Sequence, residues 1–210
     1  MLNFGRSYFI ELFLFVLPTV LIILTLHEFG HAYSAYLMGD ETAKREGRLS
    51  LNPLRHIDPF GLLALIFFKF GWGKPVPVDF LALRNLRWGM VVVSLAGPFM
   101  NFITALLLSP LLKLMNSSVV MLSGFSYFID LAYYVITYSI FLGIFNLIPI
   151  PPLDGSKVLF AMSKRPQRFL FDDTMNWFGM IFLILLIAVP FFNFQTFLMK
   201  IITPILNFLL

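Results

Sequence analysis

The sequence predicts an all-α polytopic membrane protein that forms a single domain over residues 1–210. Hydrophobic residues make up 59% of the chain, and its mean hydropathy is +0.87. Charged residues make up only 12%, whereas a soluble domain carries about 25%. Several apolar runs are long enough to cross a bilayer, which takes about 20 residues per helix. We expect about four transmembrane helices, a re-entrant segment, a short β edge element and a C-terminal interfacial helix.

The predicted spans are residues 9–38, 89–113, 127–149 and 174–193. Pro18 is expected to kink the first span, and Gly39 is expected to end it. A further apolar run, residues 60–70, is too short to cross and is bounded by Gly61 and Gly71. It is therefore predicted to enter the membrane and return to the same side.

Two elements outside the spans complete the predicted fold. Residues 75–84 are expected to be extended, and prolines at 75 and 77 confine any strand there to the edge of a sheet. Residues 196–210 form an apolar tail interrupted by a lysine and a proline, which favours a helix in the membrane interface.

The basic residues predict how the chain is oriented. If residues 60–70 do not cross, twelve of the fifteen Lys and Arg residues fall on one side of the membrane. The positive-inside rule then makes loops 39–88 and 150–173 cytoplasmic and places both termini on the opposite side. Because these charges lie between apolar runs, the net charge of +4 indicates the lipid bilayer and not nucleic acid as the partner.

This orientation can be tested by cysteine labelling, since the chain contains no cysteine of its own. A single cysteine introduced at Arg165 should react with an impermeant reagent only when the cytoplasmic face is accessible. Labelling of that cysteine from outside intact cells would contradict the predicted topology.

A candidate metal motif lies within the first span, at His27-Glu28-Phe29-Gly30-His31. On a helix, residues i and i+4 share one face, so both imidazoles can grip a single ion. Glu28 follows the first ligand and can act as a general base on water, which is the zincin arrangement. The alternative is a pair of core histidines bonded to other helices. However, ionisable groups inside a span are costly and usually functional.

A catalytic zinc site has three protein ligands and one open position. The two candidates for the third ligand are His56 and Asp154. Topology favours Asp154, because the third span runs towards the cytoplasm and ends just before it, at the depth of the two histidines. The alternatives are a helix N-cap for Asp154 and a hydrogen-bonded anchor in the turn of residues 52–61 for His56. We favour the anchor for His56.

With these residues, the chain resembles the site-2 protease family, peptidase family M50, in the short form without a PDZ or CBS domain. Two motifs carry the resemblance: HExxH at residues 27–31, and N-x-x-P-x-P-x-x-D-G from Asn146 to Gly155. Further matches lie at residues 52–61, 71–78 and 96–101. The resemblance implies that His27, His31 and Asp154 bind one zinc ion and that Glu28 is catalytic.

The implied function is zinc-dependent hydrolysis of peptide bonds in or near transmembrane segments of protein substrates, with the active site towards the cytoplasm of a prokaryotic cell membrane. Asn146 and Asn101 are candidate donors to the substrate carbonyl or the oxyanion, or else they join helices by hydrogen bonds. A substrate helix must unwind before cleavage. The extended stretch around Val76 and Val78 is a candidate partner for the unwound strand.

Three other functions fit the sequence less well. A catalytically silent relative would bind zinc without cleaving, but the loss of Glu28 would be the simplest way to silence the site. A zinc transporter needs no glutamate between its ligands. A diiron hydroxylase or desaturase needs many histidines, and this chain has three.

Overall fold

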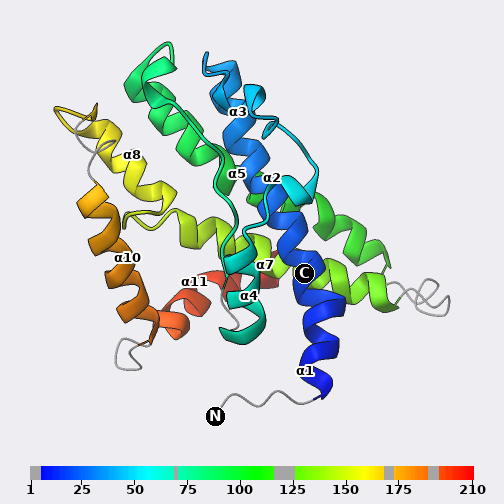
Figure 1. Cartoon of the computed structure of the whole chain (residues 1–210). Coiled ribbons are helices and arrows are strands. Elements are labelled where there is room, and N and C mark those ends of the chain that lie inside the picture. The colour runs from blue at the N-terminus through cyan, green and yellow to red at the C-terminus, as the bar shows by residue number, and fades with distance from the viewer. Residues whose placement is uncertain (1–5, 69–70, 116–125, 168–172, 189–193) are drawn as a thin grey trace.

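The computed structural model describes residues 6–68, 71–115, 126–167, 173–188 and 194–210, and this part of the chain is helical with no β-ladder (Figure 1). Three helices of the described chain are long and apolar enough to cross a membrane: Ser7–Leu37, Leu86–Leu114 and Ser126–Asn146. They coincide with the first three predicted spans. The predicted all-α membrane fold is thereby confirmed.

The first span consists of α1 (Arg6–Glu11), a π-helical turn (Leu12–Val16) and α2 (Leu17–Leu37). The irregular turn lies directly before Pro18, which has no N–H to donate to the carbonyl four residues earlier. That carbonyl belongs to Leu14, and it accepts a hydrogen bond from the Tyr127 hydroxyl at 3.1 Å. The distortion expected at Pro18 is therefore a π-turn whose free carbonyl is satisfied by another helix.

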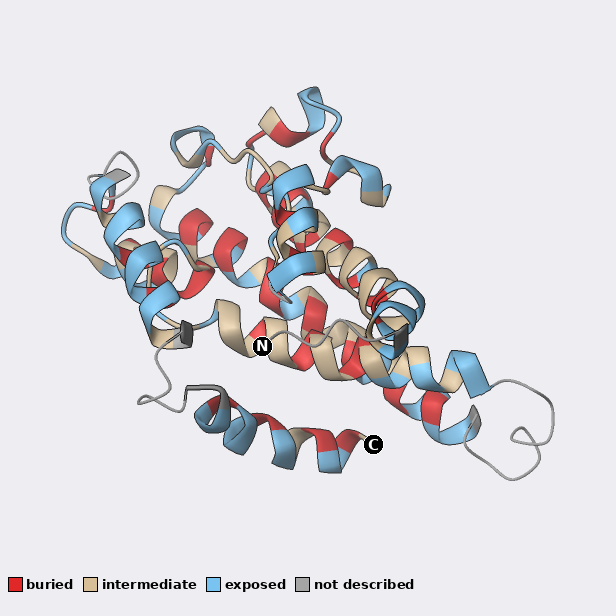
Figure 2. Ribbon diagram, turned by 60° about the horizontal axis from the view of Figure 1, so that its bottom comes forward, coloured by how far each residue is buried: buried red, intermediate tan, exposed pale blue. Residues whose placement is uncertain are grey.

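Helix α5 (Leu86–Met115) is the centre of the bundle, because it contacts α2, α7 (Ser126–Asn146) and α8 (Asp154–Met162). One apolar core joins α5 and α7 to α11 (Phe194–Leu209). Figure 2 shows this pattern, with buried residues along the inner faces of these helices and exposed residues outside. The exposed apolar side chains are those expected of a protein that meets lipid rather than water.

The last two helices correspond in part to the predictions. Helix α10 (Asp173–Ala188) has 16 residues and begins the fourth predicted span, whose final residues, 189–193, lie outside the described chain. A fourth crossing therefore stays a prediction. Helix α11 confirms that the C-terminal segment is helical, and its location in the membrane interface stays a prediction. One side of α11 packs Leu198, Ile202 and Leu206 against α5 and α7.

The predicted re-entrant segment contains helix α4 (Pro59–Phe68), and its chain turns back on itself, whereas its entry into the membrane stays a prediction. The chain leaves and returns at one point: the Lys74 N–H donates to the His56 carbonyl at 2.9 Å, and Ile57 pairs with Gly73 in an isolated antiparallel bridge. The returning backbone packs so closely that a Cβ on Gly61 would lie 2.0 Å from the Trp72 carbonyl oxygen. Only glycine allows this approach.

The predicted β edge element is wrong, because residues 74–79 form no regular strand. We call this stretch the 74–79 segment; a short 3₁₀ turn (Phe80–Ala82) follows it. A strand requires a hydrogen-bonded partner. Two prolines remove donors from the segment, and the N–H of Val76 bonds to a side chain instead. The segment therefore remains irregular.

Candidate metal centre

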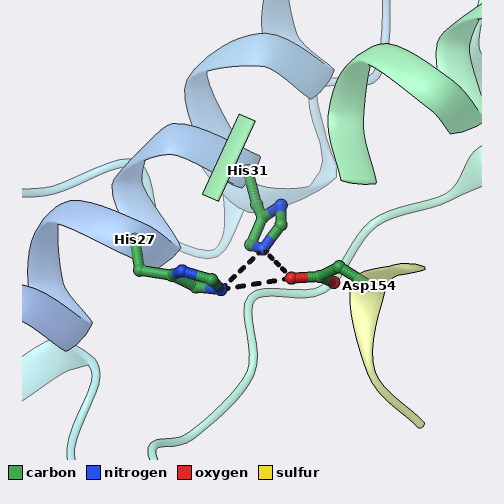
Figure 3. Close-up of side chains that lie close together, drawn as sticks. All are labelled: His27, His31 and Asp154. Atoms are coloured by element: carbon green, nitrogen blue, oxygen red, sulfur yellow. Dashed lines mark hydrogen bonds and ion pairs between the residues drawn. The ribbon is translucent and has the colours of Figure 1, made fainter. Parts of the chain in front are cut away.

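The two histidines of the HExxH motif lie on one face of α2 and are largely buried. Their Nε2 atoms are 3.1 Å apart, and both point toward the same space (Figure 3). The i, i+4 spacing on a regular helix produces this convergence. The motif therefore presents two nitrogen atoms side by side that could bind one metal ion, as its spacing predicts.

Asp154 completes a group of three. It is the first residue of α8, directly after the proline-rich turn that follows α7. Its Oδ2 lies 3.2 Å from Nε2 of His27 and 3.0 Å from Nε2 of His31 (Figure 3). The residue before it is the N-cap of α8, and that helix has no side-chain cap. The Asp154 carboxylate is therefore directed at the histidines and does not cap its own helix.

The donor set fits a zinc ion. Tetrahedral zinc with ligands at about 2.0–2.1 Å separates those ligands from one another by about 3.3 Å. The three donor atoms lie 3.0, 3.1 and 3.2 Å apart. Two imidazole nitrogens and one carboxylate oxygen are typical of catalytic zinc sites that keep a fourth position open.

The environment of His31 fixes which of its nitrogens is free. Nδ1 lies 2.7 Å from the Val93 carbonyl oxygen on α5. A carbonyl only accepts, so Nδ1 must carry the proton and donate. In the neutral ring Nε2 then has a free lone pair. This is the second-shell arrangement that orients metal-binding histidines.

His27 is held from behind by Asn101 of α5. The Asn101 Nδ2 lies 3.1 Å from Nδ1 of His27, while the buried Oδ1 of the same amide has no hydrogen-bond partner among the described residues. Turning the amide over exchanges these two atoms. Oδ1 then accepts from Nδ1–H, which leaves the His27 Nε2 lone pair free. The flipped amide therefore gives Oδ1 a hydrogen-bond partner and keeps the proton of His27 on Nδ1, which is the tautomer that a metal ion at Nε2 requires.

A glycine makes room at the two imidazoles. A Cβ on Gly97 of α5 would lie 2.3 Å from Nε2 of His31 and 2.7 Å from Nε2 of His27. Any side chain at this position would occupy the space at the two donor atoms. The close approach of α5 to α2 at this point thus depends on Gly97.

The second oxygen of Asp154 is also bonded. Lys157, one helical turn later, donates to Oδ1 at 2.9 Å and leaves Oδ2 to the histidines. Burial by itself would raise the pKa of the Asp154 carboxyl. When the histidines carry a proton on Nε2, the charge of His31 and that of Lys157, together with hydrogen bonds from both histidines, hold that pKa well below its ordinary value; a metal ion would take the place of those Nε2 protons. Asp154 is therefore ionised at neutral pH, as a metal ligand must be.

Glu28 is half-buried beside the first histidine. Its Oε2 accepts a hydrogen bond from the backbone N–H of Val76 at 2.7 Å. Among the described residues, Oε1 accepts no hydrogen bond. The carboxylate is thus anchored through one oxygen and has the other available.

Among the described residues, the remaining predicted ones form no hydrogen bond with the three donor atoms. The Asn146 amide donates to the Leu142 carbonyl of its own helix at 3.0 Å. Val78 packs against the apolar cluster of Ala35, Leu83 and Val93. His56 is buried and its Nε2 lies 2.8 Å from the Ser50 carbonyl, which is the anchoring arrangement that the sequence favours for it.

Several residues at the site have no role predicted from the sequence, although Gly97 lies within the matched stretch 96–101. Gly97 gave a signal, since a glycine next to a proline inside an apolar helix is unusual and marks a close approach. Lys157 carries a weaker sequence signal: it lies three residues after Asp154, a spacing at which two side chains of one helix can meet. The Val93 contact involves a backbone carbonyl, which carries no sequence signal.

Fold and site together define a class: a helical membrane protein with a buried His–His–Asp group able to hold a metal ion. Residues 111–189 match the sequence model of peptidase family M50. The chain is 37% identical over 183 residues to "Putative zinc metalloprotease YwhC" of Bacillus subtilis, covering 86% of this chain and 84% of the relative. The chain belongs to peptidase family M50, as its motifs predict.

Two mycobacterial proteins, each named "Putative zinc metalloprotease Rip2", are also similar. The protein of Mycolicibacterium smegmatis is 32% identical over 192 residues, with 88% of this chain and 71% of the relative covered. The protein of Mycobacterium tuberculosis strain H37Rv is 33% identical over 189 residues, with 86% and 69% covered. No solved structure matched the chain.

Proposed function

We propose that this chain is an intramembrane zinc endopeptidase, which hydrolyses peptide bonds within or beside the membrane-spanning segments of substrate proteins. Its family and the names of its relatives support the zinc metalloprotease class. One observation carries the intramembrane part. His27, Glu28 and His31 lie on the Ser7–Leu37 helix, which is long and apolar enough to span a bilayer, and Asp154, which follows the Ser126–Asn146 helix, meets the two histidines there.

Each site residue has a role in this proposal. His27, His31 and Asp154 hold the zinc ion, which when bound polarises the scissile carbonyl and lowers the pKa of water from about 15.7 towards 7. Glu28 takes the proton of the attacking water and returns it to the leaving amine. The free Oε1 suits this shuttle, because Oε2 stays anchored on the Val76 N–H.

The location of the site follows from the same elements. The histidines lie in the second half of the Ser7–Leu37 span, towards the basic loop 39–88, and Asp154 follows α7 at the same end. The positive-inside rule then supports a site near the cytoplasmic face of a single-domain membrane protein. The relatives above are bacterial, which supports a prokaryotic cell membrane.

The proposal is tested with purified protein in liposomes and a model transmembrane substrate. Cleavage should stop on addition of a chelator and return with added zinc. Zinc bound at one ion per chain without any cleavage would overturn the proposal and favour a zinc-binding membrane protein that does not cleave.

Asn101 and Asn146 should separate into two roles. Asn101→Ala removes the group behind His27 and should weaken zinc binding by about 10–100-fold, the range for such outer-shell partners. Asn146→Ala should lower kcat while zinc affinity stays unchanged, if its amide serves the substrate carbonyl or the oxyanion. Zinc competition titration and initial rates measure the two effects.

Asn207→Ala is the matched control, because Asn207 is exposed on α11. Unchanged zinc affinity in Asn101→Ala would refute its positioning role and return Asn101 to the candidate substrate donors. A parental cleavage rate in Asn146→Ala would exclude the donor role of that residue.

The 74–79 segment is the proposed docking edge for an unwound substrate. Val78→Pro should lower cleavage about tenfold or more with zinc retained, because proline removes the backbone donor that a paired strand uses. Val76→Pro should impair cleavage too, although it also removes the partner of Glu28. Val78→Ala keeps the N–H and serves as the control. Parental rates in both proline variants would count against strand pairing.

A further inference from the structure

Arg48 is a buried cation without a carboxylate partner. Its side chain lies in the loop after α3 (Thr42–Arg45), and the residue is only 6% exposed. Among the described residues it forms no ion pair. Its Nη2 instead donates to the Lys74 carbonyl at 2.7 Å and to the Pro75 carbonyl at 3.2 Å. A charged group is rarely buried in this way unless its position matters.

These bonds hold the start of the 74–79 segment, and other contacts hold both of its ends. The Lys74 N–H donates to the His56 carbonyl at 2.9 Å. At the far end the Asp79 N–H donates to Oδ2 of the fully buried Asp40 at 2.8 Å. Charge-assisted hydrogen bonds such as those of Arg48 are the stronger kind. The segment is therefore fixed at both ends.

The backbone N–H of Val76, which bonds to Glu28, lies between the two fixed ends of the 74–79 segment. Prolines at 75 and 77 have no N–H and a fixed φ, so the backbone around Val76 has little freedom. The Val76 N–H is the group bonded to Oε2 of Glu28. A shift of the Lys74 and Pro75 carbonyls would consequently move this donor.

We propose that Arg48 is a positioning residue for Glu28: by holding the Lys74 and Pro75 carbonyls it places the Val76 N–H that anchors the carboxylate. The inference rests on the proposed function, because it assigns Glu28 the proton transfer. Among the described residues, Arg48 forms no hydrogen bond or ion pair with His27, His31 or Asp154. Misplacement of a catalytic group by about 1 Å can cost about a hundredfold in rate.

The kinetic test compares Arg48→Met with Arg48→Lys and with Arg45→Met as the matched control, since Arg45 is exposed in the same region. Arg48→Met should lower kcat about tenfold or more, with zinc content unchanged. Arg48→Lys should recover part of the rate, because an ammonium group can still donate to the carbonyls. Arg45→Met should match the parent.

A double variant tests the route of the effect. If Arg48 acts through the Val76 amide, adding Arg48→Met to Val76→Pro should cost little more than Val76→Pro alone, since coupled positions are not additive. Fully additive losses would overturn the inference. So would a parental kcat in Arg48→Met.

Hydrogen–deuterium exchange gives a readout that does not depend on cleavage. Arg48→Met should speed exchange in the 74–79 segment while α2, α5 and α7 stay protected. Unchanged exchange there would overturn the inference. If Arg48→Met loosens those helices as well, the Arg48→Lys variant decides: it must show faster exchange in the 74–79 segment and a lower kcat while the helices stay protected.

A parent protein that never cleaves would refute the proposed function, and the exchange data would still decide whether Arg48 holds the 74–79 segment.

Discussion

Glu28→Ala is expected to lower cleavage by about a thousandfold or more while the protein still binds zinc. General acid–base catalysis contributes about 10²–10⁴-fold, and Glu28 is the carboxylate next to the His27–His31–Asp154 group with a free oxygen. The side chain is not one of the three donors, so its loss should leave the zinc content near one ion per chain. Initial rates on a transmembrane substrate in liposomes and metal analysis of the same sample measure both effects.

Two controls accompany this variant. Glu28→Gln keeps an oxygen that can accept from the Val76 N–H but cannot take a proton, so it should be as inactive as Glu28→Ala. Glu46→Ala removes an exposed glutamate after α3 and should cleave at the parental rate. Cleavage by Glu28→Ala within tenfold of the parent would refute the general-base role.

Asp154→Asn should abolish both zinc binding and cleavage under conditions in which the parent retains its metal. Contacts with both histidines and Lys157 keep the pKa of Asp154 low, so the parent offers a charged ligand where the variant offers a neutral amide. We expect zinc affinity to fall more than about 100-fold, beyond the range for outer-shell partners. Competition with a chelator of known affinity measures the change.

The matched control is Asp130→Asn, an equivalent substitution at an exposed position of α7. It should bind zinc and cleave as the parent does. Parental zinc affinity in Asp154→Asn would show that the third ligand lies elsewhere, and the assignment of Asp154 would be abandoned.

Much of the site could be predicted because it depends on local regularities. Helical periodicity alone places His27 and His31 on one face. Chain direction then places Asp154 near them, since the proline-rich turn ends α7 at the same end of the bundle as the histidines. Both inferences need only the hydrophobic runs and the positions of the prolines.

The supporting contacts could not be predicted, because they depend on how helices are rotated against one another. The Val93 carbonyl and the Asn101 amide meet the histidines only because α5 packs against α2 with a particular face, through Gly97. Hydropathy gives the length of α5 but not this rotation. The same rotation decides whether Asn101 faces His27 or the substrate, so hydropathy could not decide between these two roles for Asn101 either.

The 74–79 segment shows the same limit for loops. Its composition suggests an edge strand, but whether a strand forms depends on a partner elsewhere in the chain. The structure supplies Arg48, Asp40 and Glu28 as partners instead, from sequence positions far from the segment. Side chains therefore satisfy backbone groups that a neighbouring strand would otherwise pair.

The most direct test of the metal centre is zinc X-ray absorption spectroscopy on the purified full-length protein. Two imidazoles and one carboxylate should give one zinc per chain with a first shell of nitrogen and oxygen at about 2.0–2.1 Å, including scattering from two imidazole rings. A spectrum that requires no imidazole, or only one, would contradict the convergence of His27, His31 and Asp154 on a single ion.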